Sequence, residues 1–126
     1  EMCIRDSFKR VNDHYGHPAG DEVLKEVAHR AKSVLRDGDV LARYGGEEFI
    51  VLLNVASKNV ARAAAERLRT VVEAQPVRVG QLTIGVSISV GLALREGESK
   101  TLMRTIERAD ANLYRAKREG RNRVVD

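Results

Sequence analysis

The sequence predicts an α+β domain, in which helices pack over a mostly antiparallel sheet. Two strand-like runs flank a glycine pair at 45–46, which is typical of a β-hairpin. Apolar residues recur at three- and four-residue steps before and after that hairpin, as in helices that bury one face. A two-residue alternation covers 83–94, as in a strand between two different surfaces. A length of 126 residues suits one domain with one core.

Three stretches carry helical periodicity, and local residues mark their ends. The first follows a segment rich in turn-formers, Asp13 to Asp21, and is closed by Asp37-Gly38-Asp39. The second is expected to start at Ser57, a residue type that caps helices, and the third to stop at Gly120. The expected helices cover about residues 23–35, 57–73 and 101–119.

Strand character is found in shorter segments. Val40 to Tyr44 and Phe49 to Leu53 form the hairpin, and Val77 to Val79 is a short edge strand. In 83–94 the large apolar residues face one way and the small or polar residues the other. That second face is either solvated or covered closely by another element.

The two ends of the chain differ in strand character. Val124-Val125 is expected to close the sheet as a short strand. Residues 1–7 are not strand-like, so the sheet is expected to lack its first strand. A missing strand would leave a hydrophobic sheet edge open, which is an aggregation risk.

Composition and charge limit the classes of function. Apolar residues make up 43% and charged residues 32%, as in a soluble globular protein, and no apolar run approaches the roughly 20 residues of a membrane span. The net charge is +4 and the pI is near 9.5, with the excess in Arg115 to Arg123, which indicates an anionic partner or a solvated helix end. Nucleic-acid binding is disfavoured, because aromatic residues are only 4% and do not interleave with basic ones. Cys3 is the only cysteine, so no internal disulfide can form and a cytoplasmic location is expected.

The most informative motif is the hairpin tip, Gly45-Gly46-Glu47-Glu48. Glycine accepts backbone angles with φ > 0 and lets another molecule approach closely. Two adjacent glutamates at an exposed tip repel each other and gain nothing from the core. A divalent cation is the simplest explanation for them.

Polar residues elsewhere permit a nucleotide site but also have simpler explanations. Asn12 and Asp21 offer the donor and acceptors that a guanine edge requires, although both residue types are common helix caps. His17 alone is typical of a structural hydrogen-bonding residue. Lys117 and Arg121 stand four apart and can clamp a polyphosphate, although cations near a helix C-terminus are favourable in any case.

Arg36 and Asp39 form an Arg-x-x-Asp pattern just before the hairpin. An arginine fork can bind a phosphate or a guanine face, and the carboxylate can accept from a guanine edge. Taken alone, a surface ion pair is the simpler explanation.

Taken together and in this order, the motifs resemble the GGDEF domain of bacterial diguanylate cyclases, in its GGEEF variant. The resemblance covers residues 8–126 and implies a palm-like fold related to adenylyl cyclases and polymerases. Three segments carry it: Phe8-Lys-x-x-Asn12-Asp-x-x-Gly16-His17-x-x-Gly20-Asp21, then Arg43-Tyr-Gly-Gly-Glu-Glu-Phe49, then Ala109-Asp110-x-x-Leu113-Tyr114-x-Ala116-Lys117-x-x-Gly120-Arg121-Asn122.

The resemblance also implies an activity. Such domains are nucleotidyltransferases that condense two GTP molecules into cyclic di-GMP and release two pyrophosphates. Each protomer of a homodimer presents one GTP, whose 3′-hydroxyl attacks the α-phosphorus of the other. Family members usually carry a sensory or receiver domain upstream, so a longer parent protein is expected, with membrane tethering left open. The alternative is a receptor that binds GTP or cyclic di-GMP without turnover.

By similarity, the hairpin residues would be catalytic. Glu47 would coordinate Mg²⁺ or Mn²⁺, Glu48 would lie beside it, and Gly45 and Gly46 would let the hairpin approach GTP. Asn12 and Asp21 would read guanine, and the basic side chains would hold phosphates. The implied substrate-binding set is Lys9, Asn12, His17, Asp21, Lys117 and Arg121. The implied product-inhibition set is Arg36 and Asp39, with Arg43 and Arg67 as helpers.

The N-terminal segment departs from the family pattern. The residues before Phe8 usually read Asp-Ile-Asp-x, in which the first Asp supplies a second metal carboxylate and the next residue its backbone carbonyl. Here Ile4 stands where that Asp belongs and Arg5 follows it, and an isoleucine side chain has no oxygen for a cation. We hypothesise that residues 1–7 are a non-native or truncated edge of the domain at 8–126. The hypothesis rests on Met2 to Ser7, which reads as the translation of a transposon end used in sequencing libraries.

Overall fold

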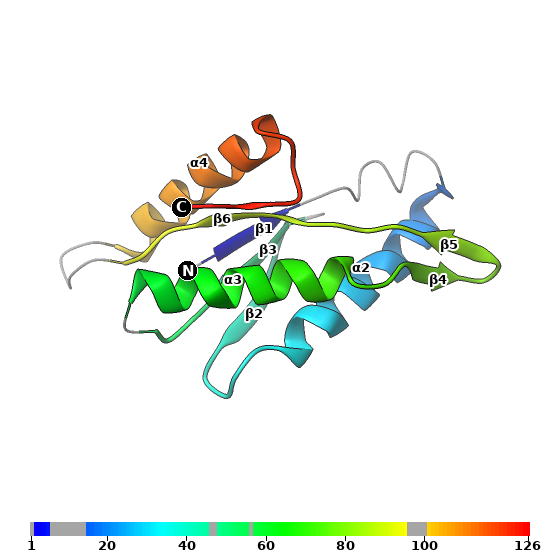
Figure 1. The fold of residues 1–126 in the computed structure, drawn as a ribbon, viewed down its shortest axis with the longest axis horizontal. Coiled ribbons are helices and arrows are strands. Elements are labelled where there is room, and N and C mark those ends of the chain that lie inside the picture. Colours follow the sequence, from blue (N-terminus) through cyan, green and yellow to red (C-terminus); the bar gives the residue numbers. More distant parts are fainter. Residues whose placement is uncertain (1, 6–14, 46–47, 56, 96–100) are drawn as a thin grey trace.

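The computed structural model of the chain describes residues 2–5, 15–45, 48–55, 57–95 and 101–126. The main sheet contains β1 (Met2–Arg5), β2 (Val40–Gly45), β3 (Glu48–Leu52), β6 (Ser89–Leu92) and β7 (Val124–Val125). The helices are α2 (His17–Ser33), α3 (Lys58–Glu73) and α4 (Leu102–Arg118), and β4 (Val77–Val79) and β5 (Leu82–Ile84) form a separate hairpin. The order in the main sheet is β2-β3-β1-β6-β7, with α4 over one face and α2 and α3 over the other (Figure 1). The ladders are antiparallel except for β6 with β7, which confirms the predicted α+β class.

Strand β1 occupies the centre of the sheet. It pairs with β3 on one side and with β6 on the other, so Ile4 lies opposite both Phe49 and Val90. The expectation that the first strand is missing is therefore wrong for this chain, and no edge is left open between β3 and β6. A central strand is held by main-chain hydrogen bonds to two neighbours, which do not require the alternating pattern that residues 1–7 lack.

Side-chain caps set the starts of α3 and α4 where the sequence predicts them. The hydroxyl of Ser57 accepts from the N–H of Val60 at 3.3 Å, and the hydroxyl of Thr101 accepts from the N–H of Arg104 at 3.3 Å. Gly120 follows α4 with a φ of 125°, as predicted for a residue that ends a helix. No helix in the described part of the chain is long and apolar enough to cross a bilayer.

Helix α2 differs from the prediction at both ends. It begins at His17, inside the segment expected to be a turn, because Pro18 fits the first turn of a helix, where its missing N–H has no partner in any case. It ends at Ser33, before the predicted stop. Val34 and Leu35 lie beyond the helix but still pack against the core.

The alternating run 83–94 is divided between two sheets. Its first residues belong to β5, which pairs with β4, and Ser89–Leu92 forms β6 of the main sheet. The predicted faces are confirmed, because the large apolar side chains from Ile84 to Leu92 are buried in the same cluster. Over β6, the small face is covered by α4 rather than by solvent.

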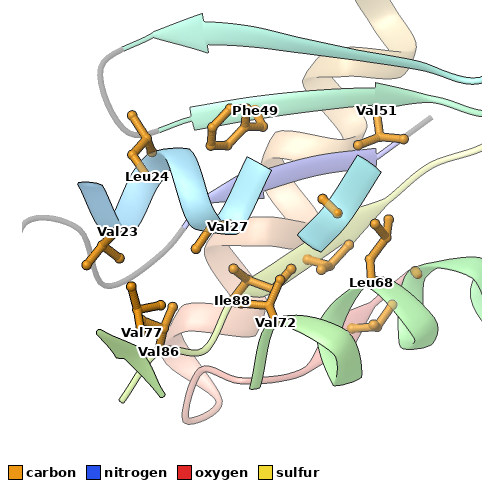
Figure 2. Packing of buried hydrophobic residues seen from close by; sticks show 14 of the residues in the cluster. Val23, Leu24, Val27, Phe49, Val51, Leu68, Val72, Val77, Val86 and Ile88 are labelled. Carbon is orange, nitrogen blue, oxygen red and sulfur yellow. The ribbon is translucent and has the colours of Figure 1, made fainter. Parts of the chain in front are cut away.

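The larger hydrophobic cluster lies between the main sheet, α2 and α3. It brings together Leu24 and Val27 of α2, Phe49 of β3, Leu68 of α3 and Ile88, which precedes β6 (Figure 2). The side chains of Leu68 and Ile88 are fully buried. Burial of one such side chain contributes about 2 kcal/mol, so this cluster is the main source of stability.

A half-buried arginine links α2 to the end of α3. The guanidinium of Arg30 donates to the carbonyl oxygens of Val72 at 2.8 Å, Gln75 at 2.5 Å and Pro76 at 3.1 Å. Its Nε donates to Glu26 at 3.0 Å. The last carbonyls of a helix have no partner within the helix, and Arg30 supplies one.

The approach of α4 to the sheet depends on Gly91. A Cβ atom at this position would lie 2.0 Å from the carbonyl oxygen of Ala109 and 2.3 Å from the backbone nitrogen of Leu113. Both atoms belong to the backbone of α4, so they cannot move aside as the end of a side chain would. Only glycine at position 91 is compatible with this packing.

We therefore expect Gly91→Ala to lower the free energy of unfolding by about 3 kcal/mol or more, because the added methyl must push α4 off the sheet. Gly85→Ala is the matched control, since a Cβ there meets no heavy atom within 4 Å. Urea unfolding followed by circular dichroism measures both. Equal stability of the two variants would contradict the close contact.

Candidate functional site

Four segments meet at one end of the main sheet. Strand β1 ends at Arg5, which lies opposite Glu48, the first residue of β3, and opposite Ser89, the first residue of β6. The segment before β7 reaches the same end, because the N–H of Val90 donates to the carbonyl of Arg123 at 2.9 Å. In Figure 1 the loop that follows α4 lies at this end of β1. The ends of three strands and the loop after α4 are therefore neighbours.

The predicted signature hairpin is present and tight. Gly45 ends β2 and lies opposite Glu48; Gly46 and Glu47, which stand between them in the sequence, lie outside the described residues. The ladder changes register between Arg43 and Gly45, as at a β-bulge. Glu48 is half-buried at the start of β3. It is the signature carboxylate that the described residues place at this end of the sheet.

The start of α2 separates the two explanations of Asp21. Gly16 is the N-cap residue, with a φ of 87° and no side-chain cap, and Asp21 lies five residues further along, exposed on the helix. The cap explanation is therefore wrong for Asp21, which leaves its carboxylate available to a ligand. His17 is the first residue of α2, and the predicted residues Lys9 and Asn12 lie outside the described residues.

The predicted phosphate-binding pair lies at the C-terminal end of α4. Lys117 is half-buried in the last turn, and Arg121 is exposed beyond it with a φ of 64°. The helix dipole favours a cation at this end of α4, which is the simpler explanation for Lys117 and Arg121 given in the sequence analysis. Nevertheless, the left-handed backbone of Arg121 is not a helical conformation, so the helix alone does not explain its position.

Arg36 and Asp39 lie on one turn after α2, but not as an ion pair between side chains. The carboxylate of Asp39 accepts from the backbone N–H of Arg36 at 2.8 Å and from that of Asn54 at 3.4 Å. The carbonyl of Arg36 in turn accepts from the N–H of Asp39 at 3.0 Å. The Arg36 side chain is exposed, as are the predicted helpers Arg43 on β2 and Arg67 on α3.

The sequence of the chain matches the family model described as diguanylate cyclase, GGDEF domain, over residues 2–123. The chain belongs to the GGDEF family. The match includes the hairpin signature, the start of α2 and the loop after α4, so it spans every described segment of the site.

Relatives of this GGDEF domain agree in sequence and fold. Diguanylate cyclase A of Treponema denticola is 49% identical over 124 residues, which are 98% of this chain and 33% of that protein. The active GGEEF domain of a diguanylate cyclase from Vibrio cholerae has a TM-score of 0.88 at 34% identity, covering 98% of this chain and 79% of that chain. The GGDEF domain of DgcB from Caulobacter crescentus, in complex with c-di-GMP, has a TM-score of 0.88 at 34% identity, covering 98% of this chain and 76% of that chain. The GGDEF domain described here thus spans 33% of the length of the first relative.

The family implies a divalent cation at the hairpin, and this GGDEF domain lacks part of the expected ligand set. Position 4 lies opposite Phe49, one residue beyond Glu48, so it does lie beside the signature strand. Its isoleucine offers no side-chain oxygen. Among the described residues, no group of three or more His, Cys, Asp or Glu side chains could hold a metal ion. Ile4 therefore does not fit the position of the second carboxylate in the expected site.

Two polar residues near the site have no role in the sequence analysis. Asn122 follows Arg121, and its side chain accepts from Arg69 of α3 at 3.0 Å. The spacing Glu66-x-x-Arg69-x-x-x-Glu73 indicates ion pairs along a helix, and the structure has them. The link to Asn122 could not be predicted, because it joins residues 53 positions apart.

Proposed function

We propose that the protein containing this GGDEF domain is a diguanylate cyclase, which converts two GTP molecules into cyclic di-GMP and two pyrophosphates. Each 3′-hydroxyl forms one bond to an α-phosphorus and gives up its proton, and each α-phosphorus loses its bond to the pyrophosphate. The reaction requires two nucleotides that face each other, so the active species is a homodimer with one GTP per protomer. It takes place in the cytoplasm, under the control of a sensory or receiver domain joined upstream.

The observation that carries this proposal is the intact signature on a tight hairpin, with Glu48 at the sheet end where β1, β3 and β6 meet. Paired glycines let a triphosphate approach the hairpin backbone. The exposed carboxylate of Asp21 accepts from the guanine edge, together with Asn12. Lys117 and Arg121 place positive charge at the same sheet end, where they hold phosphate oxygens, and Lys9 joins them in that role.

The cation is Mg²⁺ or Mn²⁺, which neutralises charge on the triphosphate when it is bound. In the intact family pattern it would be held by Glu47, by a carboxylate at position 4 and by the backbone carbonyl at position 5. Because position 4 is Ile4 here, the chain as written is a weak enzyme or an inactive one. Restoring the carboxylate is the most direct test of the proposed activity.

We expect Ile4→Asp to raise the rate of cyclic di-GMP formation from GTP and Mg²⁺ by about a hundredfold or more, since one charge-stabilising group typically contributes that much. Ile4→Asn is the matched control, polar and of similar size but without charge. Adding Glu47→Gln to Ile4→Asp should abolish product formation. Chromatography of the reaction mixture measures the product, and circular dichroism checks folding. A folded Ile4→Asp chain that binds GTP and makes no product would overturn the cyclase proposal and leave a nucleotide receptor.

The proposed product-inhibition site is Arg36 and Asp39, helped by Arg43 and Arg67. Arg36→Ala should weaken cyclic di-GMP binding at least about tenfold, the contribution of one charge-assisted hydrogen bond, without changing stability. Asp39→Ala should weaken binding and also lower the free energy of unfolding by about 1 kcal/mol, because two backbone N–H groups lose their acceptor.

Isothermal titration and urea unfolding measure these two effects separately. Arg78→Ala, an exposed arginine on β4, is the control for loss of charge. Unchanged product affinity in Arg36→Ala would remove the inhibitory role from this turn.

In this proposal residues 1–7 remain a non-native or truncated edge of the sequence of the domain at 8–126, although Met2–Arg5 takes the place of the central strand. Long-read sequencing of the locus should therefore show, in place of Met2 to Ser7, a segment that carries an Asp at position 4. A genomic reading frame with Met-Cys-Ile-Arg-Asp-Ser at this place would refute the idea.

A further inference from the structure

The loop that carries Arg121 has an unusual backbone. Gly120, Arg121 and Asn122 follow one another with φ values of 125°, 64° and 46°. Glycine adopts such angles freely and asparagine does so more readily than most residues, but arginine rarely does. Three consecutive left-handed residues persist only when surrounding contacts hold them.

Contacts within the loop supply part of that restraint. The N–H of Arg121 donates to the carbonyl of Ala116 at 2.9 Å, which closes the end of α4. The Nε of Arg123 donates to the carbonyl of Arg121 at 3.1 Å. The guanidinium of Arg123 also lies so close to Gly120 that a Cβ there would be 2.6 Å from Nη2. These contacts are local, so they fix the shape of the loop but not its place relative to α3.

The bond from Val90 to Arg123 ties the loop to β6, and the side chain of Asn122 ties it to α3. Its Oδ1 accepts from Nη1 of Arg69 at 3.0 Å, and its Nδ2 donates to the carboxylate of Glu73. The carboxylate of Glu66 accepts from the Nε of Arg69 at 3.0 Å. The Nη1 of Arg69 also lies 3.8 Å from Oε2 of Glu73. Both ends of the Asn122 amide are thus bound to α3 by partners of opposite charge. An amide bound at both ends cannot rotate without losing a hydrogen bond.

The restrained loop presents Arg121. Its side chain is exposed, and the structure gives its guanidinium no hydrogen bond or ion pair to another described residue. The loop lies at the sheet end that also carries Glu48, since Arg123 is bonded to Val90 at the start of β6. A surface arginine on a free loop would lose side-chain and backbone entropy on binding phosphate, and a loop already held in place avoids the backbone part.

We propose that Asn122 and Arg69 are positioning residues, which hold the loop 120–123 against α3 so that Arg121 faces the phosphates of a bound guanine nucleotide. The inference rests on the proposed function, because that function supplies the nucleotide. Neither residue touches the ligand in this arrangement. Their effect is on affinity for the phosphate groups, not on recognition of the base.

The test uses the full chain with Asn122→Gly, Arg69→Met and the double variant. Glycine keeps the left-handed backbone at position 122 and removes only the amide, and methionine keeps the apolar stem of Arg69. Arg121→Ala is the reference for loss of the phosphate contact. Arg30→Met is the matched control, because Arg30 is another half-buried arginine that bonds α2 to the end of α3, but none of its hydrogen bonds reaches the loop 120–123.

Two ligands are titrated, GTP and guanosine, which lacks phosphates. We expect Asn122→Gly and Arg69→Met each to weaken GTP binding about tenfold and to leave guanosine binding unchanged, as Arg121→Ala does. The double variant should be no weaker than either single one, because both remove the same link. Arg30→Met should change neither affinity. Hydrogen exchange of amides 120–123 should become faster in Asn122→Gly and Arg69→Met and not in Arg30→Met.

Each of the other possible outcomes contradicts one part of the proposal. Faster exchange with unchanged GTP affinity, while Arg121→Ala weakens it, would reduce the pair to a structural link and refute the positioning role. Unchanged exchange in both variants would refute the restraint itself. A chain that binds no guanine nucleotide would overturn the proposed function, and exchange alone would then decide whether the loop is held by α3.

Discussion

The arrangement of the site depends on the two ladders that β1 makes. Among the described strands, Met2–Arg5 alone pairs with both the hairpin β2–β3 and the pair β6–β7, so its main-chain hydrogen bonds set the register of one half of the sheet against the other. The signature glutamate belongs to the first half. The loop with Arg121 belongs to the second. Four residues of central strand therefore set the separation between Glu48 and the loop that carries Arg121.

This dependence also explains what the sequence could predict of the fold. The helices α3 and α4 and the hairpin were predictable, because periodicity, caps and turn residues are local signals and agree with the final packing. Strand β1 was not, since its pairing is determined by the exposed edges of β3 and β6 rather than by its own residues. The division of 83–94 between two sheets was also missed. Both sheets bury the same face of this run, so a single alternating pattern continues from one sheet into the other.

The candidate site shows the same limit. The motif residues were found from their order along the chain, and the structure adds where Gly45, Glu48, Asp21 and Arg121 lie. The motif could not indicate that a site residue also makes contacts that hold the fold. Asp39 supports the backbone of its own turn, so its carboxylate would have two functions at once. The contact between Arg69 and Asn122 joins two helical regions, and no local pattern encodes it.

The contact at Gly91 limits how this domain can change shape. With Ala109 and Leu113 lying directly on the strand backbone, α4 sits in a notch and cannot slide along β6 without a steric collision. Shear between a helix and a sheet is a common way to relay a signal through a protein, and the contact at Gly91 opposes it between α4 and β6. A stimulus that reaches this face of the sheet would instead move α4 and β6 together, or act on the loops beside them. In the proposed homodimer, control would then lie in how two copies are brought together, rather than in rearrangement of α4 against its own sheet.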